Sequence, residues 1–217
     1  MITLNSKEEL TTDVIKRIVE NHSGKELPRL QKLERYYKND NDIHRRIMSD
    51  ITKPNNKTAN PYASYITDTL VGYFMGEPVS YNAEDKNLLQ EINMIFEYND
   101  EADENAELAK DASIFGVAFE ELYFSEDDKM IRFKRLDPKE IIPIYDKTIE
   151  ENLIAVIRYY EDYDFVEDKK SYIIEIIDDV EITRYRTNDT FSSFALLENY
   201  PHYFGMVPVA IYENNED

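Results

Sequence analysis

The sequence contains no cysteine and no tryptophan among its 217 residues. Without cysteine the chain can form neither disulfides nor thiolate metal sites, so nothing requires an oxidising compartment and an intracellular product is expected. No run reaches the ~20 apolar residues of a membrane-spanning helix, and "MITLNSKEEL" lacks the basic and apolar regions of a signal peptide. The five glycines never form the phosphate-binding patterns GxGxxG or GxxxxGK[ST], so nucleotide hydrolysis is not expected.

Basic residues are scarce as well. The 25 Lys and Arg stand against 45 Asp and Glu, which gives a net charge of -20 and argues against a general nucleic-acid-binding surface. The compact basic groups are "HRR" at 44–46 and "RFKR" at 132–135. Contact with DNA is one interpretation of them, but a hairpin that balances charge against the acidic turn "SEDDK" is favoured. The 17 tyrosines suit both a β-rich core and half-wet interfaces.

The order of the hydrophobic patterns predicts an α+β fold, in which N-terminal helices pack on a C-terminal antiparallel β meander. Residues 1–116 are expected to be mainly helical, and 117–217 to form the β part. A capping box of Ser6 and Glu9 predicts the start of the first helix, and Gly24 its end. The expected strands are "VAFEELYF", "MIRFKRL", "EIIPIYD", "NLIAVIRYYED", "KSYIIEIIDD", "VEITRYRT", "FALLENY" and "MVPVAIYENNED". Nothing in the pattern caps the last strand, so Asp217 is interpreted as a cut inside a longer protein, although a natural C-terminus can also be frayed and acidic.

The stretch "NPYASYITDTLVGYFMGEPVSY", from Asn60 to Tyr81, predicts a helix of about 15 residues with Asn60 as N-cap and a stop at Gly76 and Pro78. One face is apolar and is expected to be buried in a core; it contains Tyr62, Ile66, Leu70, Tyr73 and Phe74. Gly72 costs up to about 1 kcal/mol inside a helix, so either another backbone approaches it closely or it is a tolerated small residue. "EPVSY" is expected to be a short edge strand.

Three acidic clusters could be mistaken for catalytic or metal sites: Glu120 with Glu121, 126–128, and 178–181. Carboxylates in turns and on strand faces are usually solvated, and a functional site needs them to converge from separate elements. His22, His44 and His202 have no zinc-ligand spacing. Two alternatives stay open: a carboxylate-based hydrolase that uses Glu120, Glu121, Asp178 and Asp179, and a stand-alone interaction module with a tyrosine-rich surface.

The Asn60–Tyr81 stretch, preceded by "NNKTAN", also resembles the signature segment of tailed-phage portal proteins, "Y-I-x-D-x-x-x-G-Y-x-x-G-x-P-V". Three further segments are similar to that family and occur in its order: "AKDASIFGVAFEELYF", "RLDPKEIIPIYD" and "HYFGMVPVAIYENNED". The resemblance covers about residues 55–215. It implies the N-terminal, wing-forming portion of a portal, without the stem, clip and crown that follow in the family.

The resemblance further implies a structural protein without catalysis, cofactor or metal. Portals of this family are dodecameric rings at one capsid vertex through which DNA enters and leaves, and their partners are terminase, scaffold, capsid and head-completion proteins. It implies a location in the virion after synthesis in the cytoplasm of a bacterial host, from a phage or a prophage. The 217-residue chain by itself is expected to be a monomer or a weak oligomer.

The motif positions are the candidate structural or subunit-interface residues. They are Asn60, Pro61, Tyr65, Asp68, Gly72, Tyr73, Gly76, Pro78, Gly116, Asp137, Pro138, Gly205 and Pro208.

Overall fold

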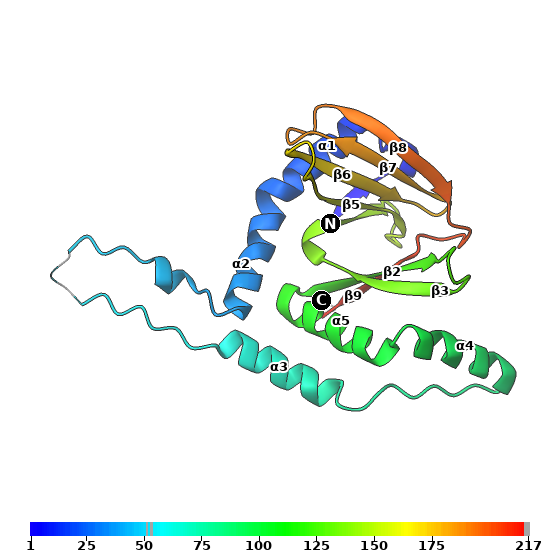
Figure 1. The fold of residues 1–217 in the computed structure, drawn as a ribbon, viewed down its shortest axis with the longest axis horizontal. Coiled ribbons are helices and arrows are strands. Elements are labelled where there is room, and N and C mark those ends of the chain that lie inside the picture. The colour runs from blue at the N-terminus through cyan, green and yellow to red at the C-terminus, as the bar shows by residue number, and fades with distance from the viewer. Residues whose placement is uncertain (51, 53, 215–217) are drawn as a thin grey trace. The chain divides into compact units, whose positions relative to one another are not determined.

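The computed structural model describes residues 1–50, 52 and 54–214, and it confirms the α+β class (Figure 1). The chain divides into two compact units. The first contains Met1–Leu27 and Phe119–Ile211, and the second contains Pro28–Ala118 and the chain from Tyr212. The helical part of the chain ends at Gly116 and a strand follows, as expected. Each of the two units, however, contains residues from before and from after Gly116. The assignment of both stretches to one portal wing stays a prediction.

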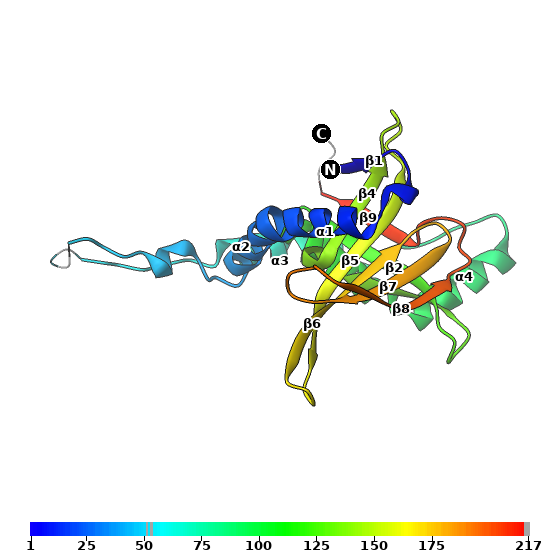
Figure 2. The ribbon, with the colours of Figure 1, turned by 90° about the horizontal axis from the view of Figure 1, so that it is seen from above.

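The first unit is built on a six-stranded sheet. In order across the sheet, its strands are β1 (Ile2–Leu4), β4 (Ile141–Asp146), β5 (Leu153–Asp164), β6 (Lys169–Ile177), β7 (Glu181–Thr187) and β8 (Phe194–Pro201). From β4 to β8 each strand pairs antiparallel with the next one in sequence, which confirms the meander. The N-terminal β1, which the sequence patterns did not indicate, adds in parallel to β4. The β5–β6 hairpin extends beyond the other strands (Figure 2).

A second, three-stranded sheet has the order β3-β2-β9. The expected hairpin is confirmed, because β2 (Val117–Phe124) pairs antiparallel with β3 (Ile131–Leu136) around the acidic turn. The last strand, β9 (Val209–Glu213), joins β2 instead of continuing the meander. Its strands β2 and β3 form one wall of a cleft in the first unit.

Helix α1 (Thr12–Asn21) covers the six-stranded sheet and forms the main core with it. Ile15, Ile18 and Val19 contribute the helix stripe, and Ile144 and Ile157 are among the fully buried strand residues. The periodic β-branched residues that predicted both elements are therefore the ones that pack together. At the edge of this core the buried His22 Nδ1 lies 2.9 Å from the hydroxyl of Tyr159, and burial lowers the pKa of His22.

Two predicted boundaries of the first helix are wrong. Ser6 makes no side-chain cap, because Glu9 instead accepts hydrogen bonds from Asn5, and α1 begins only after Thr11. Gly24 does not end the helix, since residues 22–26 form a π-helical turn that leads directly into α2 (Leu27–Tyr37). Extra i→i+5 bonding in one turn accommodates the glycine without breaking the helical path.

The second unit contains α2 and three further helices: α3 (Tyr62–Phe74), α4 (Lys86–Tyr98) and α5 (Glu101–Phe115). Between α2 and α3 the chain has little regular structure, and Arg46 donates hydrogen bonds to the Asn55 side chain (3.1 Å) and the Asn56 carbonyl (3.0 Å). The predicted "EPVSY" strand is wrong, because residues 77–82 form no strand. Parts of the polar connector, residues 51 and 53, lie outside the described residues.

Candidate functional site

The apolar face of α3 lies on the outside of the second unit, and the prediction that it packs in a core is wrong for the described chain. Six large side chains on this helix are between 52% and 93% exposed. They are Tyr62, Tyr65, Ile66, Leu70, Tyr73 and Phe74. Tyr73, at 93%, is almost completely uncovered. Apolar side chains of this size are normally the first to be buried, so this face needs an explanation.

The opposite, narrower stripe of α3 provides the contacts with its own chain. Ser64, Thr67, Val71 and Met75 recur at helical spacing and are the least exposed residues there. Thr67 is buried, and its hydroxyl lies 3.1 Å from the hydroxyl of Ser113 on α5. The Tyr37 hydroxyl donates to Asp68 (2.7 Å), and burial, supported by this hydrogen bond, raises the pKa of Tyr37 to about 12. This narrow stripe therefore attaches α3, whereas each of the six bulky side chains keeps more than half of its surface exposed.

The two glycines of the motif have different roles. A Cβ at Gly76 would lie 2.6 Å from the Gly72 carbonyl oxygen, so only glycine fits the helix end that the sequence predicted. A Cβ at Gly72 would meet nothing within 4 Å. No other backbone of the described chain therefore approaches Gly72, and the energetic cost of a glycine in mid-helix is not offset within the unit.

The remaining motif positions form turns and strand junctions. Gly116 (φ +87°) and Gly205 (φ +70°) adopt the left-handed conformation that favours glycine. Asp137 accepts a hydrogen bond from the Lys139 amide and so caps the short turn that Pro138 begins. The Pro208 carbonyl accepts from the Leu122 amide (2.8 Å), at the start of the β9 pairing. At the start of α3 the cap position is Pro61, not Asn60, and no side chain caps it.

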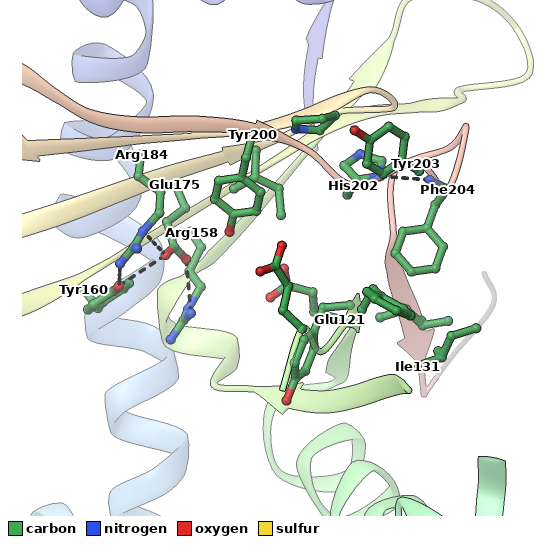
Figure 3. A pocket seen from close by; sticks show the side chains of 16 residues that line it. Glu121, Ile131, Arg158, Tyr160, Glu175, Arg184, Tyr200, His202, Tyr203 and Phe204 are labelled. Carbon is green, nitrogen blue, oxygen red and sulfur yellow. Dashed lines mark hydrogen bonds and ion pairs between the residues drawn. The ribbon is translucent and has the colours of Figure 1, made fainter. Parts of the chain in front are cut away.

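A cleft of about 1050 Å³ in the first unit brings together Glu121, Glu126 and His202, which the sequence singled out only to set aside, with residues that it did not single out (Figure 3). One wall comes from β2 and β3, with Glu121 and Ile131, and the other from β5 to β8, including Tyr200. His202 closes one end, where its Nε2 donates to the Asp178 carbonyl (2.9 Å) and its Nδ1 accepts from the Phe204 amide. The cleft is thus a mixed aromatic and charged groove between the two sheets.

Glu175 organises the charges at the other end of the cleft. It lies in cross-strand register with Arg158 on β5 and Arg184 on β7. Its two carboxylate oxygens are 3.1 Å from Arg158 Nη1 and 2.9 Å from Arg184 Nε, and Tyr160 donates a further hydrogen bond to it. The Arg158 guanidinium stacks over the Tyr160 ring at 4.5 Å. Only knowledge of the strand register could have predicted this alternation of charges from the sequence.

Glu121 points into the cleft from β2, and Figure 3 draws no bonded partner for it. Burial, supported by the negative charge of Glu175, raises the pKa of Glu121 to about 7, against a partial opposing effect of Arg158. A carboxyl in this position is therefore half protonated near neutral pH.

Replacing Glu121 with Gln should remove a pH dependence of stability. The folded chain holds this proton up to about pH 7, whereas the unfolded chain releases it near 4.5, so the free energy of unfolding falls as pH rises through that window. At pH 8 we expect E121Q to be more stable than the parent by about 1–3 kcal/mol, because each pKa unit corresponds to roughly 1.4 kcal/mol. Below pH 4.5 the two should agree. Urea unfolding from pH 4 to 8 measures this difference in stability. E126Q is the control, because Glu126 is an exposed carboxylate in the same cleft. Parallel stability curves for E121Q and the parent would contradict it.

The carboxylates of the hydrolase alternative do not form one cluster. Asp178 accepts from the amides of Val180 and Glu181, and Lys7 pairs with both Asp178 and Asp179. Within residues 1–50, 52 and 54–214, no three His, Asp or Glu side chains lie close enough together to hold a metal ion. Across the same residues, no helix combines the length and the apolar character needed to cross a membrane.

Comparisons with known proteins agree with the motif resemblance. The family described as "Phage portal protein, SPP1 Gp6-like" matches residues 16–217. The chain is 24% identical over 241 residues to the portal protein of Bacillus phage SPP1, covering all of this chain and 47% of that protein. It is 26% identical over 200 residues to the portal protein of Clostridium phage phiCD119, covering 83% of this chain and 44% of that protein. The chain thus spans about half the length of these relatives. Since the family match extends over nearly the whole sequence, the chain belongs to the SPP1 Gp6-like family of phage portal proteins.

Proposed function

We propose that this chain is part of a portal ring, the structural assembly at a capsid vertex through which phage DNA passes. The observation that carries the proposal is the family match over residues 16–217, with four motifs in the family's order. The chain spans only about half of its relatives, so the ring, its subunit number and its contacts with terminase, scaffold, capsid and head-completion proteins belong to the proposal.

The structure supports a role in protein assembly more than a role in catalysis. The prominent unexplained surface is apolar and helical, which suits contact with protein, and the charged side chains of the cleft are mostly paired with one another. A net charge of -20 also suits a conduit wall, because DNA that is not held by basic side chains can slide past it. We therefore assign the motor chemistry to a separate protein.

Ring formation is the direct test. We expect the longest product that the gene encodes to form closed rings in negative-stain electron micrographs, with a mass that is an integral multiple of the subunit mass. The 217-residue chain, measured by light scattering at the same concentration, is the matched comparison and should be a monomer or weak oligomer. A gene product that stays monomeric across the micromolar range would overturn the proposal.

A further inference from the structure

The exposed face of α3 is larger than a monomer usually leaves uncovered. With roughly 200 Å² for a whole large side chain, the four aromatic and two aliphatic side chains leave on the order of 800 Å² accessible. The largest apolar patch of a typical monomer is about 300–600 Å², and one partner in a stable protein complex contributes about 800 Å². The α3 face therefore has the area of a complete subunit contact.

A groove beside the α3 face offers a place for a side chain of a partner. A cavity of about 370 Å³ lies between α3 and α5 within the second unit, and Leu70 and Phe74 form one of its sides. Leu108 and Ala112 of α5 form the other. An apolar side chain of a partner could insert there, as anchoring residues do at the centre of interfaces. Because a Cβ at Gly72 would meet nothing within 4 Å, the space in front of the α3 backbone is open there, next to the same surface.

The charge of the helix indicates which partner fits. Asp68 is the one charged residue between Tyr62 and Phe74, and its carboxylate already accepts the hydrogen bond of Tyr37. Two copies of a chain with a net charge of -20 repel each other over most of their surfaces, and the repulsion is weakest where charge is absent. A basic partner would instead be drawn to the acidic surfaces and would gain nothing from this neutral face.

The α3 face has a large exposed area, a groove beside it, open space at Gly72 and almost no charge. From these four observations we infer that the α3 face is the surface through which one copy of this chain contacts the next. This inference rests on the proposed ring. In a ring each contact is heterologous, so the α3 face of one subunit meets a different surface of its neighbour. Tyr73, the most exposed aromatic of the face, lies within this contact.

Site-specific photocrosslinking tests the contact. The photoreactive residue p-benzoylphenylalanine, which resembles tyrosine in shape, replaces Tyr73 in the longest product of the gene, and assembled material is irradiated. The matched control carries it at Phe165, which is 89% exposed in the β5–β6 turn. We expect a ladder of covalent multimers from position 73 and none from 165. Mixing ¹⁴N- and ¹⁵N-labelled subunits before assembly shows by mass spectrometry whether each crosslink joins two copies.

Each outcome has a defined meaning. Rings that crosslink between copies at position 73 support the inference. Rings that crosslink only within one copy show that the subunit's own chain covers α3, and rings without a crosslink show that the face is outside the contact; both overturn the inference and leave the proposed ring intact. The absence of rings in the unmodified protein overturns the proposed function itself. As a second readout, Y73D should lower the assembled fraction about tenfold or more, whereas F165D should not.

Discussion

Replacing Glu175 with Ala should destabilise the first unit by about 2–4 kcal/mol. Glu175 is only 8% exposed and pairs with both Arg158 and Arg184, whose side chains are 27% and 30% exposed. Without its carboxylate, these partly desolvated cations keep only their more exposed partners, Glu140 and Glu198. Breaking a buried ion pair typically costs about 3–5 kcal/mol, and the residual exposure of the arginines reduces that value here. Urea unfolding at pH 7 followed by circular dichroism measures the change.

Glu198 provides the matched control for Glu175. It also pairs with Arg184, but its side chain is 45% exposed on the edge strand β8. Because exposed ion pairs contribute only about 0–1 kcal/mol, E198A should be close to the parent. E175A should also lower the pKa of Glu121, since the negative charge of Glu175 helps to raise it. Equal effects of E175A and E198A on stability would show that the Glu175 cluster is not the buried network described above.

Replacing Ile157 with Ala should cost about 2–5 kcal/mol of unfolding free energy. Ile157 has no exposed surface and packs at the centre of the core between α1 and the six-stranded sheet. The truncation removes apolar contacts and leaves a cavity that the neighbouring β-sheet residues cannot fill without strain. Because the chain has two units, the loss should be measured in the first unit, by hydrogen exchange of the β5 and β6 amides.

An isoleucine outside the core is the control for that measurement. Ile149 lies fully exposed in the turn between β4 and β5, so I149A should change stability by less than about 0.5 kcal/mol. Protection in β5 and β6 that is unchanged in I157A would mean that α1 and the sheet do not form one cooperative core.

Local patterns were sufficient for most elements. The β-branched runs predicted β2 to β8 in the right order, and the alternation of strands with polar turns predicted the meander. Local patterns failed where the outcome depends on distant pairing. The three residues of β1 form a strand only because β4 offers them a free edge, and β9 leaves the meander because β2 offers another. "EPVSY" found no such edge and formed no strand.

In the cleft, too, the outcome depends on distant parts of the chain and not on the local sequence. Nothing in the local sequence distinguishes Glu121 from Glu120, since both belong to one acidic pair on a strand. Strand alternation places them on opposite faces, and the position of the second sheet then puts Glu121 in a partly desolvated cleft near Glu175. The pKa of about 7 results from that arrangement, because desolvation and nearby charge depend on tertiary position.

Helix α3 shows most clearly which properties follow from the sequence and which depend on the tertiary structure. By itself, the sequence determined that this segment is a helix, that the helix stops before Gly76 and Pro78, and that the chain resembles portal proteins, because periodicity, stop signals and motif spacing are local properties. Only the tertiary structure decided which face of that helix is used within the chain. Thr67 is buried against Ser113 of α5, and the tyrosines remain outside, because burial is set by the surfaces that meet and not by the hydrophobicity of one helix.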